Sequence, residues 1–205
     1  MKTKNIILIG VVVVILTSVL YTFMGSQDQS AYNAQIDKER EERDRFMKTS
    51  PDSPFAGNPK SYKGLNYFPA DIRYKVTATL TPIKESQPVV LSTSDGKEQH
   101  YLPYAYASFD FDGFSNQLLI LENMEQGPER GTLFLPFGDG TSAGETYGAG
   151  RYLDVAKIPG NNTITLDFNK AYNPYCAYDA NFSCPFPPAE NLLRPSIRAG
   201  EKSYH

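Results

Sequence analysis

Three charged residues in a glycine-rich stretch are the first candidates for chemistry in this sequence. Asp139 and Glu145 are followed by Arg151 at the same short spacing. A carboxylic acid and a carboxylate held close together can act as general acid and general base, and an arginine can hold an anionic group. In a long ordered loop the same residue types also tie one turn to another. Two interpretations therefore remain open, a catalytic or binding site and a structural network.

Tyrosine and asparagine accumulate in and after this stretch. The ligand-binding candidates are Tyr147, Tyr172 and Tyr175, together with Asn169 and Asn173. Aromatic faces suit stacking on a sugar or a peptide, and amide side chains both donate and accept hydrogen bonds. The alternative is a rim of half-buried tyrosines, with each ring buried and each hydroxyl in water.

Cys176 and Cys184 are the only cysteines. Outside the cytoplasm two such thiols usually pair, and closing this short loop would stabilise the fold by roughly 2–3 kcal/mol. We therefore predict a disulfide. A zinc site would need more soft ligands, and the sequence offers only His100 and His205. We expect neither a metal nor a cofactor.

Two further motifs are incomplete. Residues 140–144 match the G-x-S-x-G pattern of serine hydrolases, which needs a strand-to-helix turn and a later acid and histidine. The segment that follows is glycine-rich and strand-like, and the only later histidine is His205, so a tight loop is the simpler interpretation. Asp110, Asp112 and Gly113 resemble part of a calcium loop but lack its late glutamate, so an ordinary hairpin turn is expected.

The charge balance excludes one class of partner. The 205 residues include 20 basic and 23 acidic residues, whereas nucleic-acid-binding domains carry a basic surface. The length suits one domain with additional segments, and the 14 tyrosines and 12 phenylalanines favour β-structure.

Residues 1–27 are expected to anchor the chain in a membrane. Lys2 and Lys4 precede an uncharged, largely apolar run that extends to residue 27, and about 20 apolar residues span a bilayer. Lysines on the N-terminal flank place that end in the cytoplasm and the globular part outside. The exit has no A-x-A cleavage pattern, so we predict a single-pass anchor at the cell membrane, with a cleaved signal peptide as the alternative.

Residues 28–50 are expected to form a charged helical stalk. Ser30 can cap the helix, and opposite charges four residues apart, such as Glu39 and Arg43, support it. Its thin apolar stripe favours a solvated connection between membrane and domain over a dimerising coiled coil.

Residues 51–205 are expected to form a mainly β domain. Strand patterns separated by turn signals, such as Asp95-Gly96, recur at short spacing without intervening helices, which predicts an antiparallel sandwich or barrel-like domain. The proline-rich tail is expected to wrap the surface or add an edge strand. The expected strands are residues 72–80, 88–93, 99–106, 107–111, 117–122, 132–137, 152–155 and 163–168, with the possible edge strand near 192–197.

Three long motifs resemble the signature of a known family. They are LFLPFGDGT at residues 133–141, ETYGAGRY at 145–152 and DFNKAYNPYC at 167–176. Shorter likenesses occur at residues 43–44, 53–55, 64–69 and 197–202. On these motifs the chain, from about residue 43 to its end, resembles the uncharacterised prokaryotic domain-of-unknown-function family 1684. The resemblance implies a protein with a signal, lipoprotein or membrane anchor, and it implies no activity. This chain has no lipobox cysteine, so its anchor would be the helix itself.

Two functions of different class are compatible with these features. The first is a non-catalytic binding module for an envelope glycan or peptide, which uses the central loops. The second is an envelope hydrolase or isomerase with Asp139 and Glu145 as the acid–base pair and Arg151 as the anion clamp.

Overall fold

The computed structural model describes residues 13, 28–125, 127, 130–156 and 160–204. The predicted membrane anchor, residues 1–27, lies outside this range except for Val13. Within the described residues, no helix combines the length and the apolar character needed to cross a membrane.

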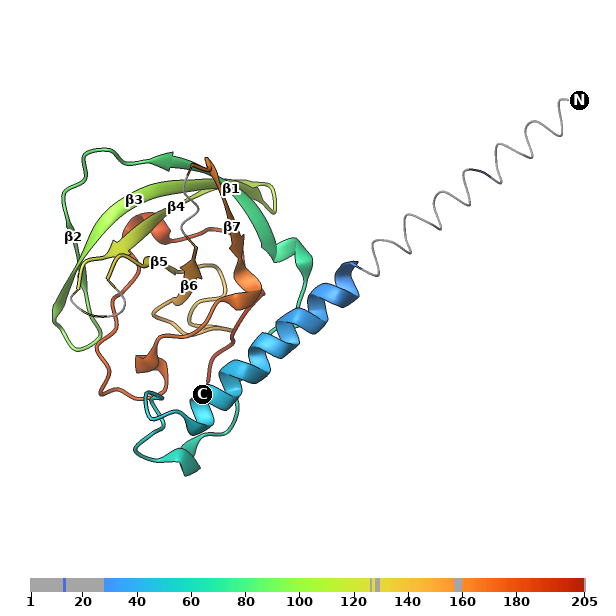
Figure 1. Cartoon of the computed structure of the whole chain (residues 1–205), viewed down its shortest axis with the longest axis vertical. Coiled ribbons are helices and arrows are strands. Elements are labelled where there is room, and N and C mark those ends of the chain that lie inside the picture. Colours follow the sequence, from blue (N-terminus) through green and yellow to red (C-terminus); the bar gives the residue numbers. More distant parts are fainter. Residues whose placement is uncertain (1–12, 14–27, 126, 128–129, 157–159, 205) are drawn as a thin grey trace, which may run out of the picture.

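The domain is mainly β, as predicted, and its strands form one curled antiparallel sheet that resembles half of a barrel (Figure 1). The strand order is β6-β5-β4-β3-β1-β7, and β2 pairs with β3 beside this path. The strands are β1 (Lys75–Pro82), β2 (Val89–Ser92), β3 (Glu98–Phe111), β4 (Phe114–Asn123), β5 (Leu133–Phe137), β6 (Arg151–Val155) and β7 (Thr163–Asp167).

A long hairpin of β3 and β4 forms the middle of the sheet. Its turn lies at Asp112 and Gly113, which both have positive φ, at 52° and 77°, as a tight two-residue hairpin turn requires. The register shifts between Pro103 and Ala105, where an irregularity of this kind bends a strand. The two strands predicted for residues 99–106 and 107–111 are therefore one bent strand, and the calcium-like motif is the hairpin turn.

The main core fills the concave side of the sheet. Side chains of the central strands, such as Leu118, Ile120 and Leu135, meet Leu193 and Ile197 from the C-terminal segment. Ile197 is fully buried. The prediction of an edge strand near residues 192–197 is wrong, because no strand forms in this described segment. The tail also does more than wrap the surface: Leu193, Ile197 and Ala199 complete the core, whereas Phe186 and Leu192 are exposed.

One asparagine fixes the tail to the sheet. The amide of Asn191 donates to the carbonyls of Leu119 (2.9 Å) and Pro136 (2.7 Å), and its oxygen accepts from the Leu119 amide (2.6 Å). β4 and β5 pair over only a short length, at Leu121–Phe134 and Glu122–Leu133. Asn191 therefore satisfies backbone groups that the diverging strands leave free.

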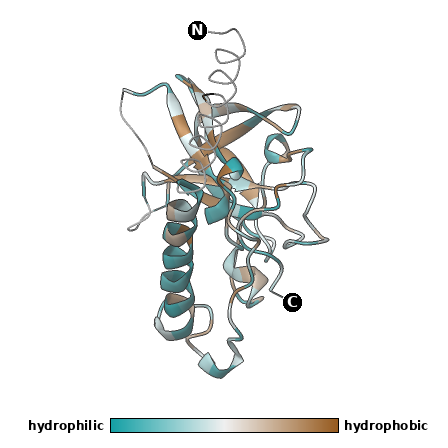
Figure 2. Ribbon diagram, turned by 90° about the vertical axis from the view of Figure 1, so that its right-hand side faces the viewer, coloured by the Kyte–Doolittle hydropathy of each residue, from teal (hydrophilic) through white to brown (hydrophobic). Residues whose placement is uncertain are grey.

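Residues 28–49 are helical and lie against the β domain (Figures 1 and 2). Tyr32, Ile36 and Met47 are buried, with exposed fractions of 6%, 1% and 0%. The Tyr32 hydroxyl donates to Asp167 Oδ1 at 2.7 Å. The predicted helix is confirmed, but over this length it is a packed element of the domain and not a solvated stalk.

The remaining regular elements are short 3-10 helices in the loops. They are η1 (Pro59–Ser61), η2 (Ile72–Tyr74), η3 (Phe168–Lys170), η4 (Tyr175–Ala177) and η5 (Ala189–Asn191). η2 takes the first residues of the strand predicted for 72–80, since Asp71 caps it by accepting from the Arg73 amide. η3 carries Asn169 and η4 carries Tyr175, and Tyr172 and Asn173 lie between them.

Candidate functional site

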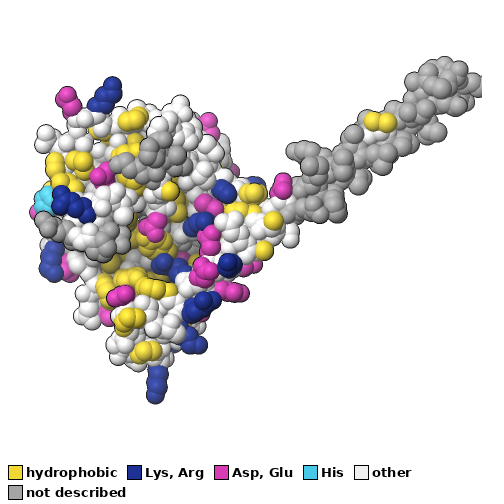
Figure 3. Space-filling view, in the orientation of Figure 1, with side chains coloured by type: hydrophobic (Ala, Val, Ile, Leu, Met, Phe, Trp, Pro, Cys, Tyr) yellow, Lys and Arg dark blue, Asp and Glu magenta, His cyan; other side chains and the backbone are white. Residues whose placement is uncertain are grey.

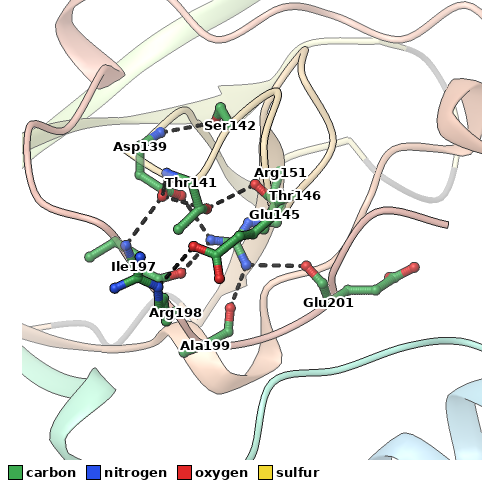
Figure 4. Close-up of polar contacts among 10 residues, drawn as sticks. All are labelled: Asp139, Thr141, Ser142, Glu145, Thr146, Arg151, Ile197, Arg198, Ala199 and Glu201. Carbon is green, nitrogen blue, oxygen red and sulfur yellow. Dashed lines mark hydrogen bonds and ion pairs between the residues drawn. The ribbon is translucent and has the colours of Figure 1, made fainter. Parts of the chain in front are cut away.

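The glycine-rich loop between β5 and β6 is organised by a buried ion pair (Figure 4). Arg151 Nη2 lies 2.8 Å from Asp139 Oδ2, and both side chains are 1% exposed. Asp139 begins the loop and Arg151 opens β6, so the pair closes the loop at its base. Burial lowers the pKa of Arg151, and the adjacent carboxylate opposes this shift.

Arg151 also holds the C-terminal segment. Its guanidinium donates to the carbonyls of Ile197 (2.8 Å), Ala199 and Glu201 (3.2 Å). Three alternate carbonyls of one irregular segment are thereby bound to one side chain. The planar guanidinium, whose N–H groups often bind anions, here donates to backbone carbonyl oxygens.

The other oxygen of Asp139 is equally occupied. It accepts from the Thr141 amide (2.7 Å), the Thr141 hydroxyl (2.6 Å) and the Ile197 amide (3.2 Å). Glu145, by contrast, is exposed and accepts from Arg198 at 2.8 Å. A buried, saturated Asp139 and a buried Arg151 present no group to a substrate, so the geometry favours the structural network over an acid–base site.

A second buried carboxylate lies beside this network, and the sequence reasoning did not identify it. Glu201 accepts from the Asn173 amide (3.1 Å), from the Asn173 side chain (2.9 Å) and from the Tyr178 hydroxyl. Its side chain is 1% exposed, and burial raises its pKa. The one available signal was its place in the family-like motif at residues 197–202.

The cysteines are free thiols, so the predicted disulfide is not formed in this structure. Cys184 Sγ accepts a hydrogen bond from the Cys176 amide at 3.1 Å. The Tyr147 hydroxyl lies 3.7 Å from Cys176 Sγ. A hydrogen bond from the Cys184 thiol lowers the pKa of Cys176 to about 6, because it stabilises the thiolate.

A cleft of about 780 Å³, which we call the aromatic cleft, lies between the helix, the sheet and the loops around η4. The sheet contributes Phe134 from β5 and Tyr152 and Asp154 from β6; the helix contributes Arg43 and Phe46. The opposite wall comes from the loops around η4. Hydrophobic side chains gather in the hollow between helix and β domain, with charged side chains at its border (Figure 3). The full lining is Arg43, Phe46, Tyr101, Asn123, Thr132, Leu133, Phe134, Tyr152, Asp154, Val155, Tyr172, Pro174, Tyr175, Phe182, Ser183, Cys184 and Pro185.

The rings of the aromatic cleft contact one another in series. Tyr101 stacks on Phe134 at 5.4 Å between centroids, and Phe134 meets Tyr152 edge-on at 4.7 Å. Tyr152 meets Tyr172 at 6.0 Å, and Tyr175 meets Phe182 at 5.2 Å in the opposite wall. Rings that support one another in this way keep a fixed surface, which suits stacking with the face of a sugar, a ring or a peptide unit.

Two polar groups of the aromatic cleft are hydrogen-bonded to its own walls. Asp154 accepts from the Tyr172 hydroxyl at 2.7 Å, and the Tyr152 hydroxyl donates to the Pro185 carbonyl at 2.6 Å. Arg43 lies over the Tyr172 ring at 4.3 Å. An apolar surface with a small number of placed polar groups is the usual composition of a ligand site.

The predicted ligand-binding residues are divided by the structure. Tyr172 and Tyr175 line the aromatic cleft, whereas Tyr147, Asn169 and Asn173 do not. Asn169 instead binds the backbone of Asp71 through its amide nitrogen (2.8 Å) and oxygen (3.0 Å), and Asn173 holds Glu201. The cleft residues that were not predicted come from distant segments, and no local pattern joins them. No group of three or more His, Cys, Asp or Glu that could hold a metal occurs in the part of the chain that the structure describes.

The comparisons with known proteins identify the family. The family described as "Protein of unknown function (DUF1684)" matches residues 60–202. The chain belongs to this family. No curated protein matches it.

A solved structure shares the fold of this DUF1684 member. It is the solution NMR structure of an uncharacterized protein from gene locus rrnAC0354 of Haloarcula marismortui, with 37% sequence identity and a TM-score of 0.66. The match covers 87% of this chain and 99% of that one.

The DUF1684 motifs can now be related to structure. The motif at residues 133–141 supplies β5 and Asp139, and the motif at 145–152 ends on Arg151 and Tyr152. The motif at 167–176 supplies Asn169, Asn173 and two of the cleft tyrosines. The motifs therefore contain both the buried network and part of the aromatic cleft.

Proposed function

We propose that this DUF1684 protein is a non-catalytic binding module and that the aromatic cleft is its ligand site. The observation that carries the proposal is the chain of mutually supported rings around an open hollow of about 780 Å³. A ligand with a flat sugar, ring or peptide face would stack there, and Asp154 and Arg43 would orient its polar groups.

The predicted location is part of the same proposal. The lysines and apolar run of residues 1–27 support a single-pass anchor with the cleft on the extracytoplasmic side. An envelope glycan or peptide is then the class of ligand within reach. An alkaline phosphatase fused after His205 is expected to be active, with the same fusion lacking residues 1–27 as the inactive control. An inactive full-length fusion would overturn the extracytoplasmic assignment.

Ligand binding is tested by thermal shift of the full-length protein against envelope oligosaccharides and peptides. A ligand at 100 times its Kd adds about 2.7 kcal/mol to stability, which is a readily measured rise in Tm. Phe134→Ala removes the ring that contacts both Tyr101 and Tyr152, so the rise is expected to disappear in this variant.

Phe114→Ala is the matched control. Phe114 is an exposed phenylalanine, 41% accessible, at the start of β4 and outside the cleft. This variant should respond to ligand like the wild type. A panel that moves no Tm, or a ligand that shifts Phe134→Ala as much as wild type, would count against the aromatic cleft as the site.

A further inference from the structure

A smaller cavity of about 220 Å³ lies between the helix and the β domain, next to the aromatic cleft. Arg43, Asp154 and Tyr172 line both spaces, so the two adjoin. Arg40 and Arg43, which lie one turn apart on the helix, line the smaller cavity together with Tyr67. A water molecule occupies about 30 Å³ in the liquid, so this cavity has room for a carboxylate or phosphate group. We call it the arginine cavity.

Its guanidinium groups have donors that nothing satisfies among the described residues. Arg43 Nε and Nη2, Arg40 Nε and the Tyr67 hydroxyl are buried and have no hydrogen-bond partner. Arg40 Nη2 reaches the Asn169 carbonyl only at 3.5 Å. Buried donors are nearly always paired, so a group of free donors around one cavity points to a missing acceptor.

Stacking on tyrosine rings holds both arginines in place. Arg40 lies 4.5 Å from the centre of the Tyr67 ring, and Arg43 lies 4.3 Å from the centre of the Tyr172 ring. Stacking on a ring fixes the plane of a guanidinium while its edge N–H groups stay available. The site is therefore arranged before a ligand arrives.

The nearby carboxylates are engaged elsewhere. Glu201 approaches Arg43 only to 3.9 Å, because Asn173 and Tyr178 hold its oxygens.

The acids on the other walls are also occupied. Glu39 pairs with Lys170 at 2.8 Å, and Asp154 accepts from Tyr172. Asp167 accepts from Tyr32. No described carboxylate therefore makes a hydrogen-bonded ion pair with either arginine.

We propose that the arginine cavity is an oxyanion subsite, in which Arg40 and Arg43 receive a carboxylate or phosphate group of the ligand bound in the aromatic cleft. The inference rests on the proposed function and narrows its ligand class to anionic molecules with a flat body. Two stacked guanidiniums with free edges match the planar, multidentate geometry of such groups.

The test is calorimetric titration of the full-length protein with small probes that share one ring. Phenyl phosphate and benzoate carry the ring and an anion, benzyl alcohol carries the ring alone, and inorganic phosphate carries the anion alone. At least one anionic ring probe is expected to bind tenfold or more tightly than benzyl alcohol, and added salt should reduce that difference. The stronger of the two anionic probes identifies the preferred group.

Arg43→Gln should abolish the preference for the anion, and Arg43→Lys, which keeps the charge but not the fork, should retain part of it. Arg45→Gln is the control, because Arg45 is an exposed arginine on the same helix. Unchanged circular dichroism spectra would show that each variant is folded. Should Arg43→Gln fail to fold, Arg40→Gln provides the same comparison.

Two binding patterns of the ring probes would overturn the subsite. One is equal binding of anionic and neutral ring probes by the wild type, which would leave the aromatic cleft as a binding site without an anion requirement. The other is an anion preference that survives in both Arg43→Gln and Arg40→Gln. Inorganic phosphate binding that neither variant weakens would likewise assign the anion to another surface. If no ring probe binds at all, both this inference and the proposed cleft are contradicted.

Discussion

At the scale of single residues, Arg151 shows how one side chain can organise a domain without chemistry. It binds Asp139 and three carbonyls of the C-terminal segment while remaining 1% exposed. A buried ion pair need not add net stability compared with apolar residues, but breaking it leaves one charge without compensation. Removal of only one partner is therefore expected to lower the stability of the fold.

Removing either partner should destabilise the fold strongly. Arg151→Met or Asp139→Asn is expected to lower the free energy of unfolding by about 3–5 kcal/mol, measured by urea denaturation. The double variant should lose less than the sum of the two single losses, because neither charge is left alone. Glu145→Gln, which affects only the exposed contact to Arg198, should change stability by about 1 kcal/mol or less. Equal losses at Asp139 and Glu145 would contradict the structural role of the buried pair.

Cys176 is expected to be the reactive thiol. Its pKa is lowered to about 6 by the neighbouring Cys184 thiol, whereas the pKa of Cys184 is raised. The thiolate is the nucleophile, so iodoacetamide should modify Cys176 at a rate that reaches half its maximum near pH 6. Cys184→Ala removes the hydrogen bond and should move this midpoint upward. Labelling that occurs only after a reductant is added would show that the predicted disulfide forms after all.

At the scale of elements, the helix of residues 28–49 packs against the β domain through apolar, hydrogen-bonded and ring contacts. Ile36 and Met47 are buried, and Tyr32 reaches Asp167. The helix is otherwise charged on its outer side. Its inner face carries the arginines of the proposed subsite, so docking of the helix and formation of the arginine cavity are the same event.

Ile36→Ala should weaken the docking of the helix. Removal of a buried isoleucine side chain costs about 2–5 kcal/mol, and the loss should appear in urea unfolding and in faster amide hydrogen exchange along the helix. Lys38→Ala, at an exposed position of the same helix, should stay within about 0.5 kcal/mol of wild type. A small effect at Ile36 would indicate that the helix is not a stable part of the domain.

At the scale of the whole molecule, Glu201 lies where the helix, the loop before η4 and the C-terminal segment meet. Its pKa is raised by burial above the ordinary value of 4.5. In the folded protein it therefore binds a proton more tightly than in the unfolded chain. Its contribution to stability is fully present below pH 4.5 and is lost as the pH rises through its folded pKa.

This linkage predicts a specific pH dependence. The stability difference between the wild type and Glu201→Gln should decrease as the pH rises from about 4.5 to 8, because the glutamine cannot lose a proton. Urea denaturation of both proteins across this range provides the measurement. A difference that grows with pH would mean that Asn173 and Tyr178 stabilise the carboxylate more than burial penalises it.

The sequence by itself determined the class of the domain, most of its strands and its family. Alternating side chains indicate which backbone segments can pair, and the Asp112-Gly113 turn is a local signal that the structure retained. The predicted charge pair of Glu39 with Arg43 is not formed, because Glu39 pairs with Lys170 instead. The sequence also singled out Asp139 and Arg151 as candidate site residues, because charged residues stand out among glycine and apolar neighbours. Their role as a buried structural pair could not be predicted, since the sequence of a loop does not specify which distant segment packs over it.

Only the tertiary structure decided where a ligand site can lie. The lining residues of the aromatic cleft, among them Arg43, Phe134 and Tyr172, are far apart in the chain and meet because the sheet curls and the helix docks beside it. The tertiary structure also placed Ile197 in the core and left N–H donors of Arg40 and Arg43 without partners among the described residues. Local patterns fix backbone geometry, whereas exposure and pairing of a side chain depend on contacts between distant segments.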